Sequence, residues 1–241
     1  MQHYPANWPA PRGINAFTTT RIHGVSLGSY ASNNLALHVN DSRQDVLANR
    51  QALIQSLDIP GEPAWLDQTH STICVHVEQE NNRQADAAIT RLTDQPLVIL
   101  TADCLPILIC NRDGTELAAI HAGWRGLVGG VIENTLIRIQ SPADQLMAWI
   151  GPGICKSCYP VGADTRDQII TSNQRLTENI VLNNGSFYAD LPGMAGRILT
   201  DMGIRSIHYS NACTFEENKL FYSYRHTPKT GRMATFIWSS S

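Results

Sequence analysis

One cysteine and two histidines lie at predicted strand ends or turns. Cys104 follows Asp103 between two apolar runs, and His121 closes a third apolar run. His70 lies at a predicted turn earlier in the chain. Thiolate and imidazole are common ligands of zinc, and three protein ligands leave the fourth tetrahedral position for water or substrate. Such an open position is typical of a catalytic zinc site rather than a structural one.

The spacing of these residues leaves other interpretations open. They are far apart in the chain, and the single CxxC motif, Cys155-Lys-Ser-Cys158, has no second pair to complete a compact zinc signature. A buried thiol beside two hydrogen-bonded histidines is the simplest structural alternative. In a catalytic alternative Cys104 is a nucleophile that attacks an amide, with His121 or His70 as its base. A third alternative is a metal-binding module without turnover.

The elements that must position these residues are predicted from apolar periodicity and turn residues. Apolar runs at 96–102, 105–111 and 115–122 predict strands whose ends would carry Cys104 and His121. Further strands are expected at 14–21, 64–70, 72–79, 85–90, 145–151, 187–191, 205–210, 219–225 and 232–238, and helices at 41–57, 126–139, 162–174 and 192–203. The predicted fold class is therefore mixed α/β (α+β), with layered β-sheets flanked by helices around one continuous core.

Composition and charge argue against several classes of protein. The chain has 241 residues, a net charge of −3 and 43% hydrophobic residues, which suits a globular protein with a large core. The weak negative charge offers no general attraction to nucleic acid or anionic membranes, and no apolar run is long enough to span a bilayer. We see no signal peptide, so the six cysteines are expected to be reduced. We therefore expect the protein to be cytoplasmic, and our expectation for its assembly is a monomer or weak homodimer.

Several segments resemble one known family. The segments "TADCLPILICN", "AAIHAGWRGL", "IGPGICKSCYPVG" and "FYSYRHTPKTGRMATFIW", with the early "TTTRIHGVSLGSYASNNLALHVND", are similar to the polyphenol-oxidase (laccase-domain) family of bacteria and animals. The similarity extends through nearly the whole chain. It implies a single catalytic domain over 1–241, with a layered fold related to some cysteine hydrolases. The family's zinc ligands correspond here to His70, Cys104 and His121.

The resemblance also implies an activity and further site residues. Members of the family are mainly described as purine nucleoside phosphorylases with adenosine deaminase activity, which implies adenosine, inosine, methylthioadenosine and phosphate as substrates. The forked guanidinium of arginine suits phosphate, so Arg125 is the first candidate and Arg50 the second. Asn34 and His38 match a loop of the family and would line the substrate pocket. Asp103 would either move protons during deamination or orient a neighbouring group.

Departures from the family pattern affect the substrate pocket more than the metal ligands. Ser71 replaces the usual glycine after the first ligand, Cys155 replaces a glycine and Pro160 replaces a glutamate. The resemblance also implies two rival activities. One is a cysteine-type amidase that edits peptidoglycan precursors. The other is a polyphenol oxidoreductase with copper at the zinc site, although eight histidines without a His-x-His pair do not suit a multicopper centre.

Overall fold

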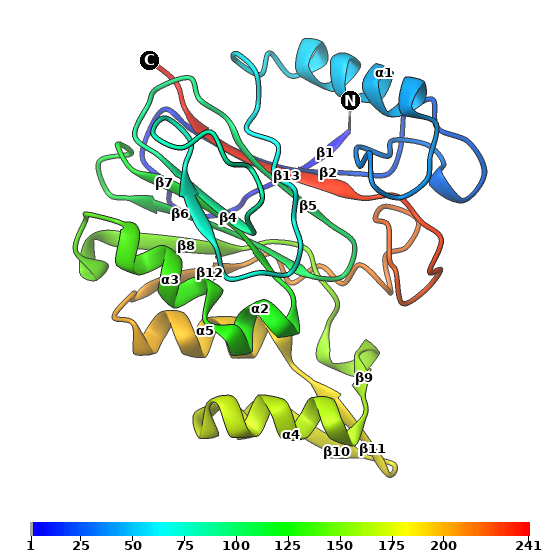
Figure 1. The fold of residues 1–241 in the computed structure, drawn as a ribbon, viewed down its shortest axis with the longest axis vertical. Helices are drawn as coiled ribbons and strands as arrows, with labels where there is room; N and C mark the ends of the chain where they lie inside the picture. The colour runs from blue at the N-terminus through cyan, green and yellow to red at the C-terminus, as the bar shows by residue number, and fades with distance from the viewer. Residues whose placement is uncertain (1) are drawn as a thin grey trace.

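The computed structural model describes residues 2–241 and arranges them in four main layers (Figure 1). Helix α1 (Arg43–Ser56) covers one sheet, whose strands lie in the order β1-β2-β13-β5. This sheet packs on a second sheet of order β12-β8-β6-β7-β4-β3, and helices α2, α3 and α5 cover the other face of the second sheet. The mixed α/β class, with sheets flanked by helices, is therefore confirmed.

The bounds of the elements follow the apolar runs closely. The first sheet contains β1 (His3–Pro5), β2 (Ile14–Thr19), β5 (Leu97–Thr101) and β13 (Met233–Ser239). The second contains β3 (Cys74–His76), β4 (Ala87–Thr90), β6 (Leu105–Asn111), β7 (Leu117–Ala122), β8 (Leu146–Ile150) and β12 (Ser206–Tyr209). The helices are α2 (Trp124–Gly129), α3 (Val131–Arg138), α4 (Ala163–Ser172) and α5 (Leu191–Asp201).

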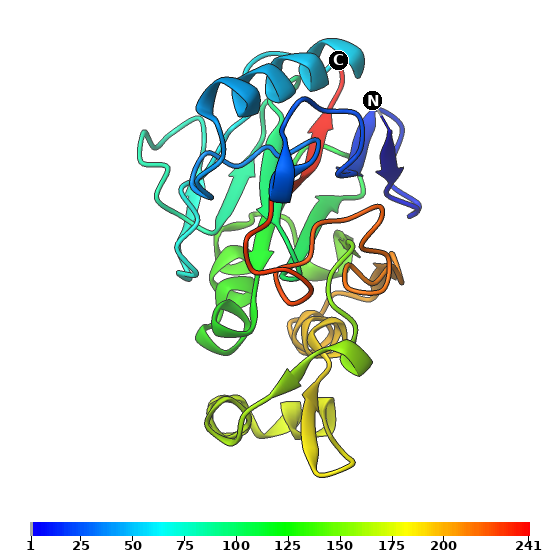
Figure 2. The same ribbon diagram turned by 90° about the vertical axis from the view of Figure 1, so that its right-hand side faces the viewer.

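A small unit lies beyond α5, at the end of the molecule opposite α1 (Figure 2). It consists of α4 and a three-stranded sheet of β9 (Pro160–Val161), β10 (Ile180–Asn183) and β11 (Ser186–Ala189). Among the helices of residues 2–241, none has the length and apolar content that crossing a membrane requires.

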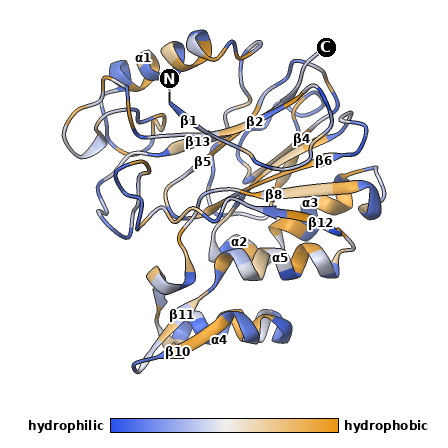
Figure 3. Cartoon of the chain, turned by 180° about the vertical axis from the view of Figure 1, so that it is seen from behind, coloured by the Kyte–Doolittle hydropathy of each residue, from blue (hydrophilic) through white to orange (hydrophobic). Residues whose placement is uncertain are grey.

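The core is built on both faces of both sheets. One cluster lies between the second sheet and its helices, a second lies between the two sheets, and a third lies between the first sheet and α1. Every residue of β4 to β8 is buried, which explains why these segments are continuous apolar runs rather than alternating ones (Figure 3). Each fully buried leucine or isoleucine contributes about 1.5–3 kcal/mol to stability.

Strand register explains why two residues distant in sequence meet. Strand β6 is antiparallel to β7, and Leu105 is the pairing partner of Ala122 while Pro106 is that of His121. The start of β6 therefore lies opposite the end of β7. Cys104 directly precedes β6, so this pairing brings it close to His121 near the end of β7.

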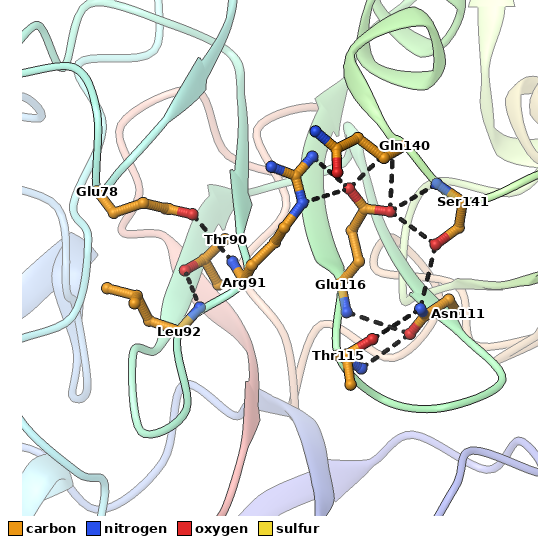
Figure 4. Close-up of polar contacts among 9 residues, drawn as sticks. All are labelled: Glu78, Thr90, Arg91, Leu92, Asn111, Thr115, Glu116, Gln140 and Ser141. Atoms are coloured by element: carbon orange, nitrogen blue, oxygen red, sulfur yellow. Dashed lines mark hydrogen bonds and ion pairs between the residues drawn. The ribbon is translucent and has the colours of Figure 1, made fainter.

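A polar network holds the opposite end of the β6–β7 hairpin (Figure 4). Glu116, directly before β7, is buried and accepts hydrogen bonds from the N–H groups of Gln140 and Ser141 and from the Ser141 hydroxyl. Its carboxylate also pairs with Arg91, at 2.6 Å. Asn111, at the end of β6, accepts from the Thr115 N–H, at 2.9 Å. These hydrogen bonds join the turn between β6 and β7 to the loop that follows α3.

Most predicted elements are present, with three differences. Helix α1 has the expected cap, because the Ser42 side chain accepts from the Asp45 N–H, at 3.4 Å. The single helix predicted over 126–139 was wrong, because Gly130 adopts a left-handed φ of 93° and separates α2 from α3. The strands predicted at 64–70 and 219–225 were also wrong. The first makes one isolated bridge, and in the second the backbone donors bond to turns and side chains instead of a neighbouring strand.

Candidate metal centre and cavity

Three potential ligand atoms converge where the central strands β6 and β7 of the second sheet begin and end. His70 comes from the loop before β3, Cys104 from the turn before β6 and His121 from β7. One donor atom of each residue lies within 4.8 Å of the others, and the Cys104 Sγ is 3.9 Å from the His70 Nε2. Zinc binds sulfur and nitrogen at about 2.0–2.3 Å, which places two tetrahedral donors ~3.5 Å apart. Small side-chain movements are therefore sufficient for the three residues to bind one ion.

The turn that presents Cys104 is held by its neighbour. Asp103 has a φ of 87°, a left-handed conformation that is rare for residues other than glycine. Its buried carboxylate accepts from the Thr214 hydroxyl and from the Arg225 backbone N–H, both at 2.7 Å. Both carboxylate oxygens thus accept hydrogen bonds from the segment 214–225. The arrangement places Asp103 beside the ligands as a group that fixes the turn.

One buried carboxylate orients two of the three clustered residues. Asp86 lies 2.7 Å from the Nδ1 of His121 and also accepts from the backbone N–H of His70, at 3.1 Å. The Ser71 N–H and hydroxyl donate to the same group, at 2.6 and 2.7 Å. The contact to Nδ1 leaves Nε2 of His121 for a metal or substrate, the arrangement usual for histidine ligands. Sequence reasoning missed Asp86, although an acid inside the apolar run 85–90 was a signal.

Charged neighbours outweigh burial at this centre. Burial raises the pKa of the Cys104 thiol, but His121 and His70 lower it to about 6. Burial lowers the pKa of His121, whereas Cys104 and Asp86 raise it to about 9. Burial raises the pKa of Asp86, while hydrogen bonds from His121 and Ser71 bring it to about 2. Cys104 is therefore a thiolate at neutral pH, the form of cysteine that binds metals and attacks electrophiles.

Gly123 provides the space in which the ligands meet. A Cβ atom at this position would lie 2.9 Å from the Cys104 Sγ and 3.2 Å from the His70 Cδ2. Side-chain carbons do not normally approach so closely. Any other residue at position 123 would therefore displace the side chain of Cys104 or His70.

The three ligands form part of the wall of a cavity of about 450 Å³. Such a volume is within the usual range of small-molecule sites. The wall also carries three arginines and three aromatic rings, namely Arg125, Arg225, Arg232, Trp124, Tyr159 and Tyr224. Cations and aromatic faces beside a metal-binding cluster can bind an anionic group and a flat ring together.

The predicted site residues fall into two groups. His38, Asp103 and Arg125 line the cavity with the three ligands. Burial, with Arg232 and Arg50, lowers the pKa of His38, so its imidazole is neutral at neutral pH.

Asn34 and Arg50 lie outside the cavity wall. The Asn34 Oδ1 accepts from the backbone N–H groups of Ala36 and Arg232, both at 3.0 Å, so it supports the wall from behind. The Arg50 guanidinium stacks 3.5 Å from the centre of the Trp65 ring and donates to the Leu35 carbonyl.

Arg225 and Arg232 were missed by the sequence reasoning. Arg225 stacks over the ring of Tyr159, at 4.5 Å, and donates to the Pro160 carbonyl, at 2.8 Å. Arg232 precedes β13, and its Nη1 donates to the carbonyls of Thr230 and Gly231. A charged residue directly before the apolar run of β13 was the available signal.

The fold and the site together define a layered α/β protein with an open Cys/His cluster in a cationic cavity. The chain belongs to the multi-copper polyphenol oxidoreductase laccase family, whose model matches residues 15–240. The resemblance stated from the motifs is therefore confirmed.

Related proteins match along nearly their whole length. A protein of Haemophilus influenzae named purine nucleoside phosphorylase is 40% identical over 99% of both chains. The purine nucleoside phosphorylase YfiH of Shigella flexneri is 38% identical over 96% of both chains. Among solved structures, the Neisseria meningitidis protein NMB0706 superposes with a TM-score of 0.94, at 38% identity over all of both chains. YlmD of Geobacillus stearothermophilus gives a TM-score of 0.87, at 28% identity over 97% of this chain and 94% of that one.

Proposed function

We propose that this protein is a metal-dependent purine nucleoside phosphorylase, with zinc bound by His70, Cys104 and His121. The observation that carries the proposal is the combination of this cluster, three arginines and three aromatic rings around one cavity. The names of the relatives support the reaction class. The proposed substrates are adenosine, inosine and methylthioadenosine, with adenosine deamination as a second activity.

The arginines give the proposed site an anion-binding side. In phosphorolysis a phosphate oxygen bonds to the anomeric carbon of the sugar while the bond from that carbon to the purine nitrogen breaks. The electron pair leaves with the base, which then takes up a proton. Arg125, Arg225 and Arg232 all line the cavity and would hold the phosphate dianion. Arg225 suits this task best, because its stack on Tyr159 and bond to Pro160 already fix its orientation.

The aromatic side chains give the cavity a second, ring-binding side. Trp124, Tyr159 and Tyr224 contribute to the wall, and Tyr224 is half exposed. A flat purine ring can stack on such faces, while the neutral His38 supplies a hydrogen-bonding group without adding charge. The cavity thereby offers different surfaces to the two ends of a nucleoside–phosphate pair.

The donor set fits zinc, and it also fits copper at the same position. One thiolate sulfur and two imidazole nitrogens are ligands that both ions accept. A bound zinc would supply a Lewis acid to polarise a substrate or activate a water for deamination. Within residues 2–241 this is the one cluster of three or more potential ligands that includes histidine. It resembles a single-ion site rather than a multicopper centre.

We assign Asp103 the role of positioning the turn that carries Cys104, because Thr214 and Arg225 donate hydrogen bonds to both of its carboxylate oxygens.

The test combines metal content with product analysis. Purified protein would be analysed for metal and incubated with adenosine and phosphate, and the products separated by chromatography. The proposal predicts about one equivalent of zinc at this cluster and formation of adenine with ribose 1-phosphate, or of hypoxanthine. Both should be lost in His70→Ala, Cys104→Ala and His121→Ala. His208→Ala, whose ring bonds Ser206 on β12, is the control and should keep both.

A second candidate is a cysteine amidase, favoured by one specific alignment. Asp86 orients His121, and His121 lies beside Cys104, which is the order of groups in a cysteine nucleophile triad. An amidase acting on peptidoglycan precursors would lose activity to thiol alkylation and keep it in chelators. A zinc phosphorylase would lose activity to chelators and regain it with zinc. Zinc without any product from nucleosides would reject the purine assignment and retain the metal centre.

A further inference from the structure

A second cluster of soft ligands lies outside the cavity. The side chains of Cys155, Cys158, Cys213 and Glu216 place one sulfur or oxygen atom each within 4.8 Å of the others. The Cys158 Sγ is 3.5 Å from the Glu216 Oε1, and the Cys155 backbone N–H donates to the Cys213 Sγ, at 3.3 Å. All three cysteines are free thiols. The CxxC motif, which lacked a second pair in the sequence, therefore finds its partners in the tertiary structure.

Backbone pairing holds the two halves of this cluster in place. Gly153 forms a parallel bridge with Cys213, and its carbonyl accepts from the Thr214 N–H, at 3.0 Å. Cys155 directly precedes a single 3-10 turn at Lys156–Cys158 and Cys158 ends it, so the turn brings both thiols into the same cluster. Cys213 is buried, the other two cysteines are partly buried and Glu216 is exposed. The backbone pairing and the turn thus bring the four groups together.

The chemistry of these groups favours a thiophilic cation. Three thiolates and one carboxylate fill the four positions of a tetrahedral ion, and a CxxC turn is a common half of such sites. A disulfide would use only two of the three sulfurs, would require an oxidant and would leave the Glu216 contact unexplained. Cation binding requires only that the thiols release their protons to solvent as the metal–sulfur bonds form.

We propose that Cys155, Cys158, Cys213 and Glu216 bind a second divalent cation, with zinc as the fitting ion. The protein supplies all four ligands, so the site is structural and offers no open position to a substrate. It is separate from the His70, Cys104 and His121 cluster and does not depend on the proposed activity.

The second site connects to the cavity through the backbone. Ile154 lines the cavity, and its N–H donates to the carbonyl of Asp103, at 2.9 Å. Thr214, next to Cys213, donates to the carboxylate of the same Asp103. A cation that joins the two segments would therefore stiffen the turn that presents Cys104. The structural ion would act as a clamp behind the first metal centre.

The experiment measures bound metal per chain after reconstitution with zinc and removal of the excess. We expect about two equivalents in the unaltered protein and about one in Cys158→Ser. The paired change His70→Ala with Cys104→Ala should also leave about one, and the combination of all three changes should leave none. Cys110→Ala is the matched control, because Cys110 is a buried thiol on β6 outside both clusters, and it should retain two. Circular dichroism verifies that each variant is folded.

A second measurement requires no change at the proposed site. In the His70→Ala, Cys104→Ala protein loaded with cobalt, a strong thiolate-to-cobalt absorption should remain, and zinc should protect Cys155, Cys158 and Cys213 together from alkylation. One equivalent in the unaltered protein that Cys158→Ser does not change would overturn the proposal. So would a disulfide between two of these cysteines in protein prepared without air, together with failure to bind zinc after reduction.

Discussion

The carboxylate of Asp86 lies 2.7 Å from the Nδ1 of His121 and is completely buried. The same carboxylate accepts from the backbone N–H groups of Thr69, His70 and Ser71. One residue of the β3–β4 region thus fixes the ring of one ligand and the loop that carries another. Metal affinity should therefore depend on Asp86, although it does not itself belong to the ligand cluster.

Replacing Asp86→Asn should weaken zinc binding about 10–100-fold, the usual consequence of losing a partner that orients a histidine ligand. The dissociation constant would be measured by competition with a chelator. Asp190→Asn is the matched control, because Asp190 also accepts from a backbone N–H but caps α5 and makes no hydrogen bond to the three proposed ligands. Equal zinc affinity in Asp86→Asn and the unaltered protein would contradict the assignment.

Replacing Gly123→Ala should abolish zinc binding at the proposed site of His70, Cys104 and His121. The new methyl group would lie 2.9 Å from the Cys104 Sγ, so the ligands must separate, and overpacking typically costs about 1–3 kcal/mol of stability. Gly162→Ala is the control, because a Cβ at that helix cap meets nothing within 4 Å. Zinc content and thermal unfolding would be measured for both. Normal zinc content in Gly123→Ala would show that the ligands do not meet as described.

Replacing Arg225→Lys should raise the KM for phosphate about tenfold, since lysine lacks the fork that matches phosphate oxygens. The KM for the nucleoside should change less. Arg166→Lys is matched, because Arg166 also stacks on an aromatic ring, that of Phe187, at 4.2 Å. Steady-state kinetics with phosphate varied gives the answer. A similar KM for phosphate in both variants would remove Arg225 from the proposed anion site.

Glu116→Gln should lower the free energy of unfolding by about 1–3 kcal/mol at neutral pH, because buried donors lose a charged acceptor. Burial raises the pKa of Glu116, but the Gln140 N–H, the Ser141 groups and Arg91 together bring it below its ordinary value. Because the pKa of Glu116 is lower in the folded state, its carboxylate stabilises the folded protein fully at pH values above its pKa in the unfolded state, about 4.3. This contribution is lost as the pH falls through the lower, folded-state pKa.

The difference between Glu116→Gln and the unaltered protein should therefore shrink in acid. Denaturant unfolding at several pH values measures it. Glu178→Gln is the control, because that side chain is 84% exposed and its ion pair with Arg197 is long, at 3.9 Å. A pH-independent difference for Glu116→Gln would mean that the lost stability arises from packing and not from the charge.

Local patterns were sufficient where the physical signal is local. The buried strands β5 to β8 are continuous apolar segments, and α1 has its capping serine, so both were predictable from the chain alone. Gly130 interrupts the predicted helix because it adopts a left-handed φ of 93°, which ends α2 before α3 begins. The segment 219–225 is rich in aromatic residues, as strands are, but its backbone bonds to Asp103 and to turns.

The sequence by itself determined which groups could do chemistry here: one cysteine and two histidines at predicted strand ends and turns, in motifs that identify the family. Only the tertiary structure decided which other groups join them. Asp86, Arg225 and Arg232 reach the centre from distant parts of the chain, and Arg50 is held at Trp65. Likewise, Cys213 and Glu216 complete a cluster with the isolated CxxC motif. Strand pairing and burial bring these residues together, and the spacing of residues along the chain does not predict which distant segments will pair.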